Sequence, residues 1–127
     1  MAESDIRATV SAVETAAARV IKRIGFEIGN ELKRTTPIDT SWARANWLTS
    51  IGRPVTAPAG SRESVGIASG AQSAGEARLL VYNVNQGDVW ISNNVPYIQK
   101  LNEGHSKQAP AGFIEVAIAT AIRTIAA

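Results

Sequence analysis

The residues most able to do nucleophilic chemistry are a histidine and a serine that are adjacent in the sequence. His105, the chain's only histidine, precedes Ser106 in a segment rich in glycine, proline and polar residues. A nucleophile and its general base normally come from distant segments, because sequence neighbours seldom reach the required geometry. A loop histidine more often is a surface or hydrogen-bonding residue. A small hydrolase that uses His105 and Ser106 is therefore an alternative. It would require an activity that is abolished by His105→Ala while the protein stays folded.

Acidic residues and glycines do not assemble another kind of catalytic site. Asp39, Asp88 and Glu103 each stand where a turn or a cap uses a carboxylate, and no spacing puts two of them on one face. A chain with no cysteine and one histidine has no thiolate zinc, iron–sulfur or multi-histidine site. The glycines within residues 66–75 lack the lysine of a phosphate-binding loop. We therefore predict no enzyme, no cofactor and no metal.

Length and charge limit the remaining classes of protein. The chain has 127 residues, which suits a single domain over residues 1–127, and 13 basic against 11 acidic residues give a net charge of +2. Nucleic-acid-binding proteins normally show a clustered basic stripe. A small nucleic-acid-binding module is therefore a disfavoured alternative. No stretch is long and apolar enough to cross a bilayer, so we expect no membrane partner.

A long amphipathic helix is predicted first in the chain. Apolar residues recur at steps of three and four from Ile6 to Leu32, and most charges fall elsewhere. Pro37 stops the helix, because the residue before a proline is pushed out of helical geometry. Gly25 and Gly29 each lower helix stability by roughly 1 kcal/mol relative to alanine. Either another backbone approaches closely at these glycines or a partly exposed helix tolerates them.

Two strands and a long loop are predicted next. Alternating residues over 44–51 predict a strand that ends near residues 52–54, and residues 89–93 predict a second strand. Residues 53–75 are rich in Pro, Gly, Ser and Ala. We expect this segment to form a flexible loop or an intersubunit arm, with a short strand at 64–67.

Three further helical segments complete the expected fold. Helix formers predict a helix over 71–83, a short helical segment starts at residue 95, and Pro110 suits the first position of a final helix. The final helix has an apolar stripe of Ile114, Ile118, Ile122 and Ile125. The expected fold class is α+β: a long N-terminal helix and a C-terminal helix packed on a small, mainly antiparallel β-sheet, with a long internal loop.

Two polar, turn-rich segments are the most informative parts of the chain. The first corner (residues 36–47) and the second corner (residues 93–112) are dense in groups that bond backbone amides and fix turns. They either build turns alone or also frame a contact between subunits. The residues predicted to shape this structural interface are Thr36, Pro37, Asp39, Thr40, Arg44, Asn46, Trp47, Asn93, Asn94, Pro96, Tyr97, Leu101, Glu103, Gly104, Ser106, Gln108, Ala109, Pro110 and Gly112.

Both corners resemble a family of bacteriophage proteins. The resemblance rests on TPIDTSWARANW in the first corner and on ISNNVPYIQKLNEGHSKQAPAGFIEVAI around the second. The chain is similar to the head–tail connection (neck), or tail-completion, proteins of long-tailed bacteriophages, the gene-product-ten-like family. That family's pattern has T-P-[VI]-D-T-G-x-[AL]-R-x-x-W, then N-x-x-P-Y-A and a corner with G-x-S-x-Q-A-P-x-G. Ser41, Trp42 and Ile98 depart from it, and a serine takes a left-handed conformation less easily than the usual glycine.

The resemblance implies a structural virion protein that acts by shape and adhesion. It implies a ring, of six copies of the chain, that completes the tail and joins it to the DNA-filled head around the genome channel. Its partners would be further copies of itself, head-closure or connector proteins, and tail terminator or tail-tube proteins. Genome DNA would pass through without specific recognition. The protein would be assembled in the host cytoplasm and located in the neck or tail of the virion. A tail terminator ring that caps the tail tube is the closest alternative.

Overall fold

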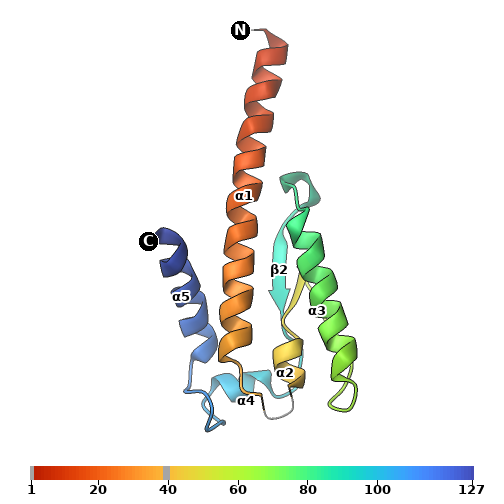
Figure 1. Ribbon diagram of the computed structural model, residues 1–127, viewed down its shortest axis with the longest axis vertical. Coiled ribbons are helices and arrows are strands. Elements are labelled where there is room, and N and C mark those ends of the chain that lie inside the picture. Colours follow the sequence, from red (N-terminus) through yellow and green to blue (C-terminus); the bar gives the residue numbers. More distant parts are fainter. Residues whose placement is uncertain (1, 39–40) are drawn as a thin grey trace.

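The computed structural model describes residues 2–38 and 41–127 and has the expected α+β fold (Figure 1). The helices are α1 (Glu3–Thr35), α2 (Trp42–Ala45), α3 (Val65–Leu80), α4 (Ile98–Asn102) and α5 (Phe113–Ala126), with a 3₁₀ helix η1 (Val84–Gln86). Strands β1 (Leu48–Ile51) and β2 (Val89–Ser92) form a two-stranded antiparallel sheet. Leu48 pairs with Ser92 and Ile51 with Val89, which fixes the register. In the described part of the chain, no helix combines the length and the hydropathy needed to cross a membrane.

Helix α1 is the axis of the molecule. Its 33 residues correspond to a length of about 50 Å. Helix α5 packs along one side of its C-terminal half, while β2 and α3 lie on the other side, and the N-terminal part projects beyond them (Figure 1). The helix ends at Thr35 and Thr36 is extended, as predicted from Pro37.

The core consists of two clusters that α1 connects. The lower cluster gathers Leu32 of α1, Trp47, Val95 and residues of α4 and α5 such as Phe113. The upper cluster contains Ala18, Leu79 and Tyr82, with partly buried apolar residues around them. Alanines contribute to both, with Ala43, Ala109 and Ala117 in the lower cluster and Ala18 in the upper one. Such small side chains allow the backbones to approach closely.

Two sequence predictions in the middle of the chain are wrong. Residues 53–75 are not one loop, and there is no strand at 64–67, because helix α3 already begins at Val65. Its buried face is made of Ala68, Gly75 and Leu79, a pattern too small in side-chain volume to show as an apolar stripe. A Cβ on Gly75 would overlap the Thr49 carbonyl oxygen of β1. The helix therefore packs on the sheet through its bare backbone.

The predicted first strand is also shorter than expected. Residues 42–45 form the helical turn α2, and the strand begins only at Leu48. The turn is started by Ser41, which takes a left-handed conformation with φ of 60°, although serine adopts it less easily than glycine. The final helix begins at Phe113, three residues after Pro110, because Gly112 (φ 77°) precedes it in a left-handed conformation.

The two glycines of α1 differ in their surroundings. A Cβ on Gly25 would lie 2.8 Å from Leu79 Cδ2, so a side chain of α3 packs against this position. A Cβ on Gly29 would meet nothing within 4 Å. Close packing therefore explains Gly25, although the neighbour is a side chain and not a backbone, and Gly29 is simply tolerated.

Candidate assembly interface

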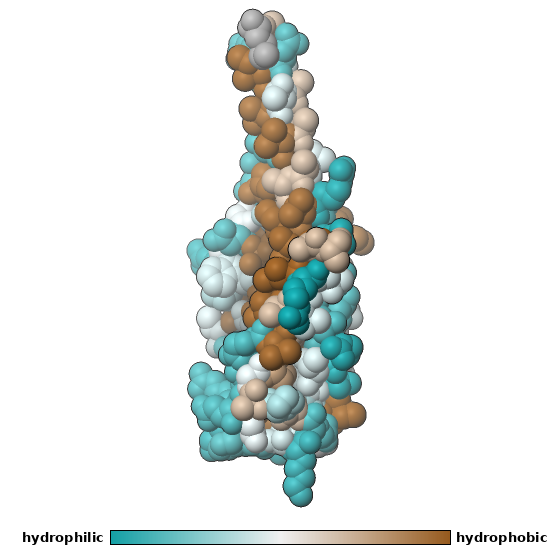
Figure 2. All heavy atoms as spheres, turned by 90° about the vertical axis from the view of Figure 1, so that its left-hand side faces the viewer, coloured by the Kyte–Doolittle hydropathy of each residue, from teal (hydrophilic) through white to brown (hydrophobic). Residues whose placement is uncertain are grey.

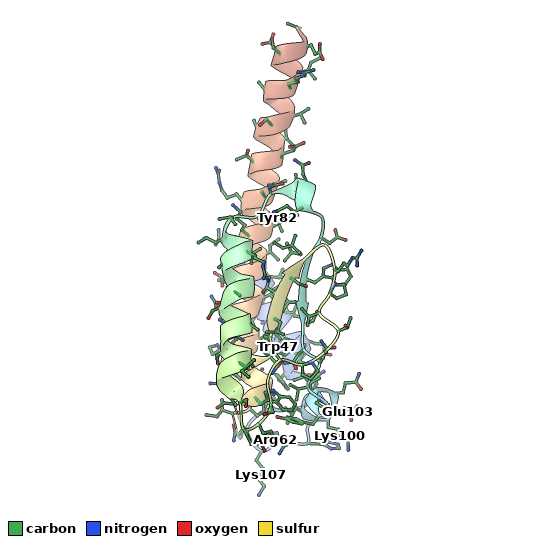
Figure 3. The ribbon with its side chains drawn as sticks, turned by 90° about the vertical axis from the view of Figure 1, so that its right-hand side faces the viewer. Trp47, Arg62, Tyr82, Lys100, Glu103 and Lys107 are labelled. Atoms are coloured by element: carbon green, nitrogen blue, oxygen red, sulfur yellow. The ribbon has the colours of Figure 1, made fainter. Side chains whose placement is uncertain are left out.

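The first corner is held together by buried polar contacts. Trp47 Nε1 donates a hydrogen bond to Thr36 Oγ1 at 2.8 Å, and the Thr36 hydroxyl donates to the Leu32 carbonyl at 2.5 Å. The guanidinium of Arg44 donates to the Thr36 carbonyl at 3.0 Å. Thr36 is 1% exposed and Trp47 is 7% exposed. These side chains therefore fasten the end of α1 to α2 and β1. Figure 3 shows Trp47 inside the body.

Asn46 ties the following loop to the first corner. Its side chain is fully buried, and its Oδ1 accepts from the Ala59 amide at 2.7 Å. Its Nδ2 donates to the Ala59 and Trp42 carbonyls. The Asn46 side chain thus supplies hydrogen-bond partners to backbone groups of the loop that no strand or helix satisfies. The sequence shows an asparagine here but not the loop that it binds.

The second corner begins with two asparagines that bind across to the first. Asn93 Nδ2 donates to the Ala43 carbonyl at 2.9 Å, while its Oδ1 accepts from the Val95 amide. Asn94 Nδ2 donates to the Val55 carbonyl at 2.8 Å. The asparagine pair therefore joins the end of β2 to α2 and to the loop after β1.

The end of the second corner closes on α5 and on the end of α1. The Gly112 amide donates to the Asn102 carbonyl at 2.6 Å, and Asn102 Oδ1 accepts from the Ile114 amide at 2.9 Å. Gln108 Oε1 accepts from the Ile38 amide at 2.9 Å, so it links the two corners directly. Leu101 is partly buried against the lower cluster, and Ala109 belongs to it.

The structure brings most of the predicted interface residues together at one end of the molecule, but turns many of them inward. Those that are exposed include Pro96, Glu103, Gly104, Gln108 and Pro110. Pro37 is buried, and Asp39 and Thr40 lie outside the described residues. This end of the molecule is called the base. Most of the described members lie inside it, and fewer of them form its exposed surface.

An aromatic and cationic group at the base combines residues of both corners with Arg62. The Tyr97 ring lies 6.1 Å from the Trp42 ring, and the Arg62 guanidinium carbon lies 4.8 Å from the centre of the Tyr97 ring. Figure 3 shows Arg62, Lys100, Glu103 and Lys107 at this end of the molecule. Both signs of charge are present there, so the base is not a uniformly basic surface.

The histidine–serine pair has no catalytic arrangement among the described residues. Ser106 Oγ accepts a hydrogen bond from the Gln108 amide at 3.1 Å, which is a turn contact, and His105 is exposed. Within residues 2–38 and 41–127, no group of three or more His, Cys, Asp or Glu side chains could hold a metal ion.

The largest feature that sequence reasoning missed is an uncovered apolar surface on α1. Ile6, Val10, Val13 and Val20 are 50–63% exposed. Figure 2 shows an apolar band that follows α1 from its projecting end down into the body. The sequence contains this stripe, but it does not reveal that the body of the protein stops short of it. A contiguous exposed apolar surface is typical of binding sites, which makes this stripe a candidate interface.

A groove between α1 and β2 continues the apolar surface. It encloses about 440 Å³ and is lined by Ile21, Ile24, Gly25, Ile28, Tyr82, Asp88, Val89, Trp90 and Ile91. Trp90 is 40% exposed. Asp88 is the charged member of this lining. The groove arises from tertiary packing, so no local pattern predicts it.

Helix α5 adds a second partly uncovered apolar face. Its buried residues are Phe113, Ala117 and Ala121, which face α1. The predicted isoleucine stripe lies beside this face and not on it: Ile122 is 53% exposed, whereas Ile114 is partly buried against the lower cluster. Alanines make the contact because they allow the two helices to approach closely.

Comparisons with protein-family models, curated proteins and solved structures find no match to this chain.

Proposed function

We propose that this protein is a structural component of a bacteriophage neck, whose copies form a ring that completes the tail and joins it to the DNA-filled head. The observation that carries the proposal is the uncovered apolar surface of α1 and its groove, in a chain whose polar corner residues are largely used for internal contacts. A protein built in this way is suited to adhesion between proteins. The resemblance of both corners to neck proteins supplies the biological setting.

The corner contacts support the proposal because they make the base rigid. The side chains of Arg44, Asn46, Asn93 and Gln108 each bind backbone groups of another segment. Because the base is already rigid, its chain segments lose little conformational entropy when a partner binds. The residues on which the family resemblance rests would thus keep the base rigid in a joining protein.

Apolar burial supplies the attraction between copies. A half-exposed Val or Ile that becomes buried contributes about 1 kcal/mol, and four such residues lie along α1. Association itself costs at least about 4 kcal/mol. One copy therefore binds another weakly through this stripe alone. A closed ring, in which every copy makes two contacts, is the stable form.

The charge of the chain suits a passage for DNA. A net charge of +2 over 127 residues supplies few cations for phosphates, and each phosphate contact would add a salt-dependent hold on the moving genome. The proposed ring surrounds the genome without recognising its sequence.

A joining assay tests the function. Heads and tails that accumulate without this protein are mixed with the purified protein, and joined particles are counted by electron microscopy and by infectivity. We expect joining to be restored by the unaltered chain and by Arg123→Ala, a change of an exposed side chain on α5. Failure of the folded protein to restore joining contradicts the proposed function.

A further inference from the structure

We infer that the groove between α1 and β2 binds the projecting N-terminal segment of α1 (residues 3–13) from a second copy of the chain. This inference deepens the proposed function, since a ring needs two unlike patches on every subunit. The segment and the groove are such a pair: one protrudes, the other is hollow, and both lie along the same apolar stripe of α1.

The segment and the groove match in length and in spacing. Ile6, Val10 and Val13 span seven residue steps, about 10 Å along a helix. The groove is lined along α1 by Ile21 to Ile28, which is also seven steps. If the segment lies in the groove with Ile6 level with Ile21, Val13 comes level with Ile28.

Charge decides the direction in which the segment enters. Arg7 is the only basic residue between residues 2 and 18, and Asp88 is the only charged residue in the groove lining. Asp88 lies at the Ile21 end, because its neighbour Val89 packs with Ile21 on the upper cluster whereas Ile91 and Ile28 pack on the lower cluster.

Only the parallel direction pairs these two charges. With Ile6 at the Ile21 end, Arg7 comes to the end of the groove that holds Asp88. In the reverse direction Glu14 faces Asp88 with no cation beside it, and two carboxylates repel each other. Glu3 and Asp5 reach this end in the parallel direction, so the preference rests on the pairing of Arg7 with Asp88. The two helices therefore run in the same general direction, offset by fifteen residues, or about 22 Å. In a closed ring they must also cross at an angle, because strictly parallel copies with this offset would build an open filament. Arg7 now pairs with Glu3 on an exposed surface, a contact weak enough to give way or to extend to Asp88.

Engineered cysteines test the contact, since the chain has none of its own. Val10→Cys and Trp90→Cys proteins of different mass are mixed and oxidised. We expect the unlike disulfide dimer to exceed either like dimer at least tenfold, and the double variant to give a ladder of covalent oligomers. Val116→Cys, an equally exposed valine on α5, is the matched control and should not cross-link to Trp90→Cys.

Charge reversal tests the direction. Arg7→Asp and Asp88→Arg should each reduce the yield of the unlike dimer at least threefold, and the two changes together should restore it. Arg123→Asp on α5 should change nothing. Failure of the double reversal to restore cross-linking overturns the parallel arrangement.

Other outcomes overturn the inference and are separable from the function. Preferential Val10→Cys homodimers mean that the segments pair with each other, and a control cross-link as strong as the predicted one means non-specific contact. A chain that stays monomeric at the highest soluble concentration also contradicts the inference. If rings join heads to tails but this cross-link does not form, the proposed function is supported and the inferred contact is wrong. If the cross-link forms but the protein does not restore joining, the contact is supported and the proposed function is wrong.

Discussion

At the base of the molecule polar side chains are buried and paired, whereas along the projecting part of α1 apolar side chains lie exposed. Thr36 and Asn46 are almost inaccessible, while Val10 and Val13 are more than half exposed. Every buried side-chain nitrogen or oxygen in the described part of the chain has a partner. The comparison teaches that the residues most noticeable in the sequence maintain the fold, and that the surface left for binding is made of ordinary aliphatic residues.

A pair of tryptophans gives the largest expected contrast between the two regions. Trp47→Ala should lower the free energy of unfolding by about 3–5 kcal/mol, because it opens a cavity in the lower cluster and removes the partner of Thr36. Trp90→Ala should lower it by about 1 kcal/mol or less, because Trp90 is 40% exposed in the groove. Urea denaturation measures both. Equal losses of unfolding free energy in the two variants would contradict the assignment of Trp47 to the core and of Trp90 to the groove.

A pair of helical glycines sharpens the comparison at the level of the backbone. Gly75→Ala should lower stability by about 3 kcal/mol, because the new methyl group meets the backbone of Thr49. Gly29→Ala should raise stability by up to about 1 kcal/mol, because it adds helix propensity in open space. Thermal unfolding followed by circular dichroism distinguishes the signs. A Gly75→Ala protein as stable as the unaltered chain would show that α3 does not pack on β1 through bare backbone.

Two asparagines test the polar network. Asn46→Ala should lower stability by about 2 kcal/mol, because it leaves the Ala59 amide without its partner, although the Ala59 carbonyl keeps its hydrogen bond from Trp42 Nε1. Asn30→Ala, an exposed position on α1, should change it by less than about 0.5 kcal/mol. Denaturant midpoints for both proteins, with unchanged m-values, provide the measurement. A loss at Asn30 as large as the loss at Asn46 would argue against the network.

The smallest effect on stability belongs to the projecting segment. Val10→Ser should change the free energy of unfolding by less than about 0.5 kcal/mol, because the side chain is already 51% exposed. It should nevertheless weaken self-association measured by sedimentation. Thr9→Ser, one residue away on the polar side, is the matched control. A stability loss of several kcal/mol from Val10→Ser would place this residue in the fold and not in binding.

Regular periodicity made much of the fold predictable. The stripe from Ile6 to Leu32 and the stop at Pro37 predicted α1. Alternation predicted β1 with a start that was too early, and high β-propensity predicted β2. The predicted helix over 71–83 covers only the second part of α3, and its start at Val65 was missed because buried positions such as Ala68 and Gly75 are small. Side chains of that size contribute little hydropathy contrast, whereas the close backbone contact that they allow is visible only in three dimensions.

The candidate interface was predictable only in part. Turn chemistry marked residues such as Asn93 and Gln108, but residue type does not tell whether an amide binds its own chain or a partner. The groove joins Ile24 of α1 to Trp90 of β2, residues far apart in the sequence. No local pattern relates them, so the groove is visible only in the structure.

The most direct test of the central proposal is the location of the protein in purified virions, determined by cryo-electron microscopy of the junction between head and tail. We expect density for a ring of copies of this α+β fold at the neck, surrounding the DNA channel. Intact, joined particles whose neck is fully accounted for by other proteins would contradict the proposal.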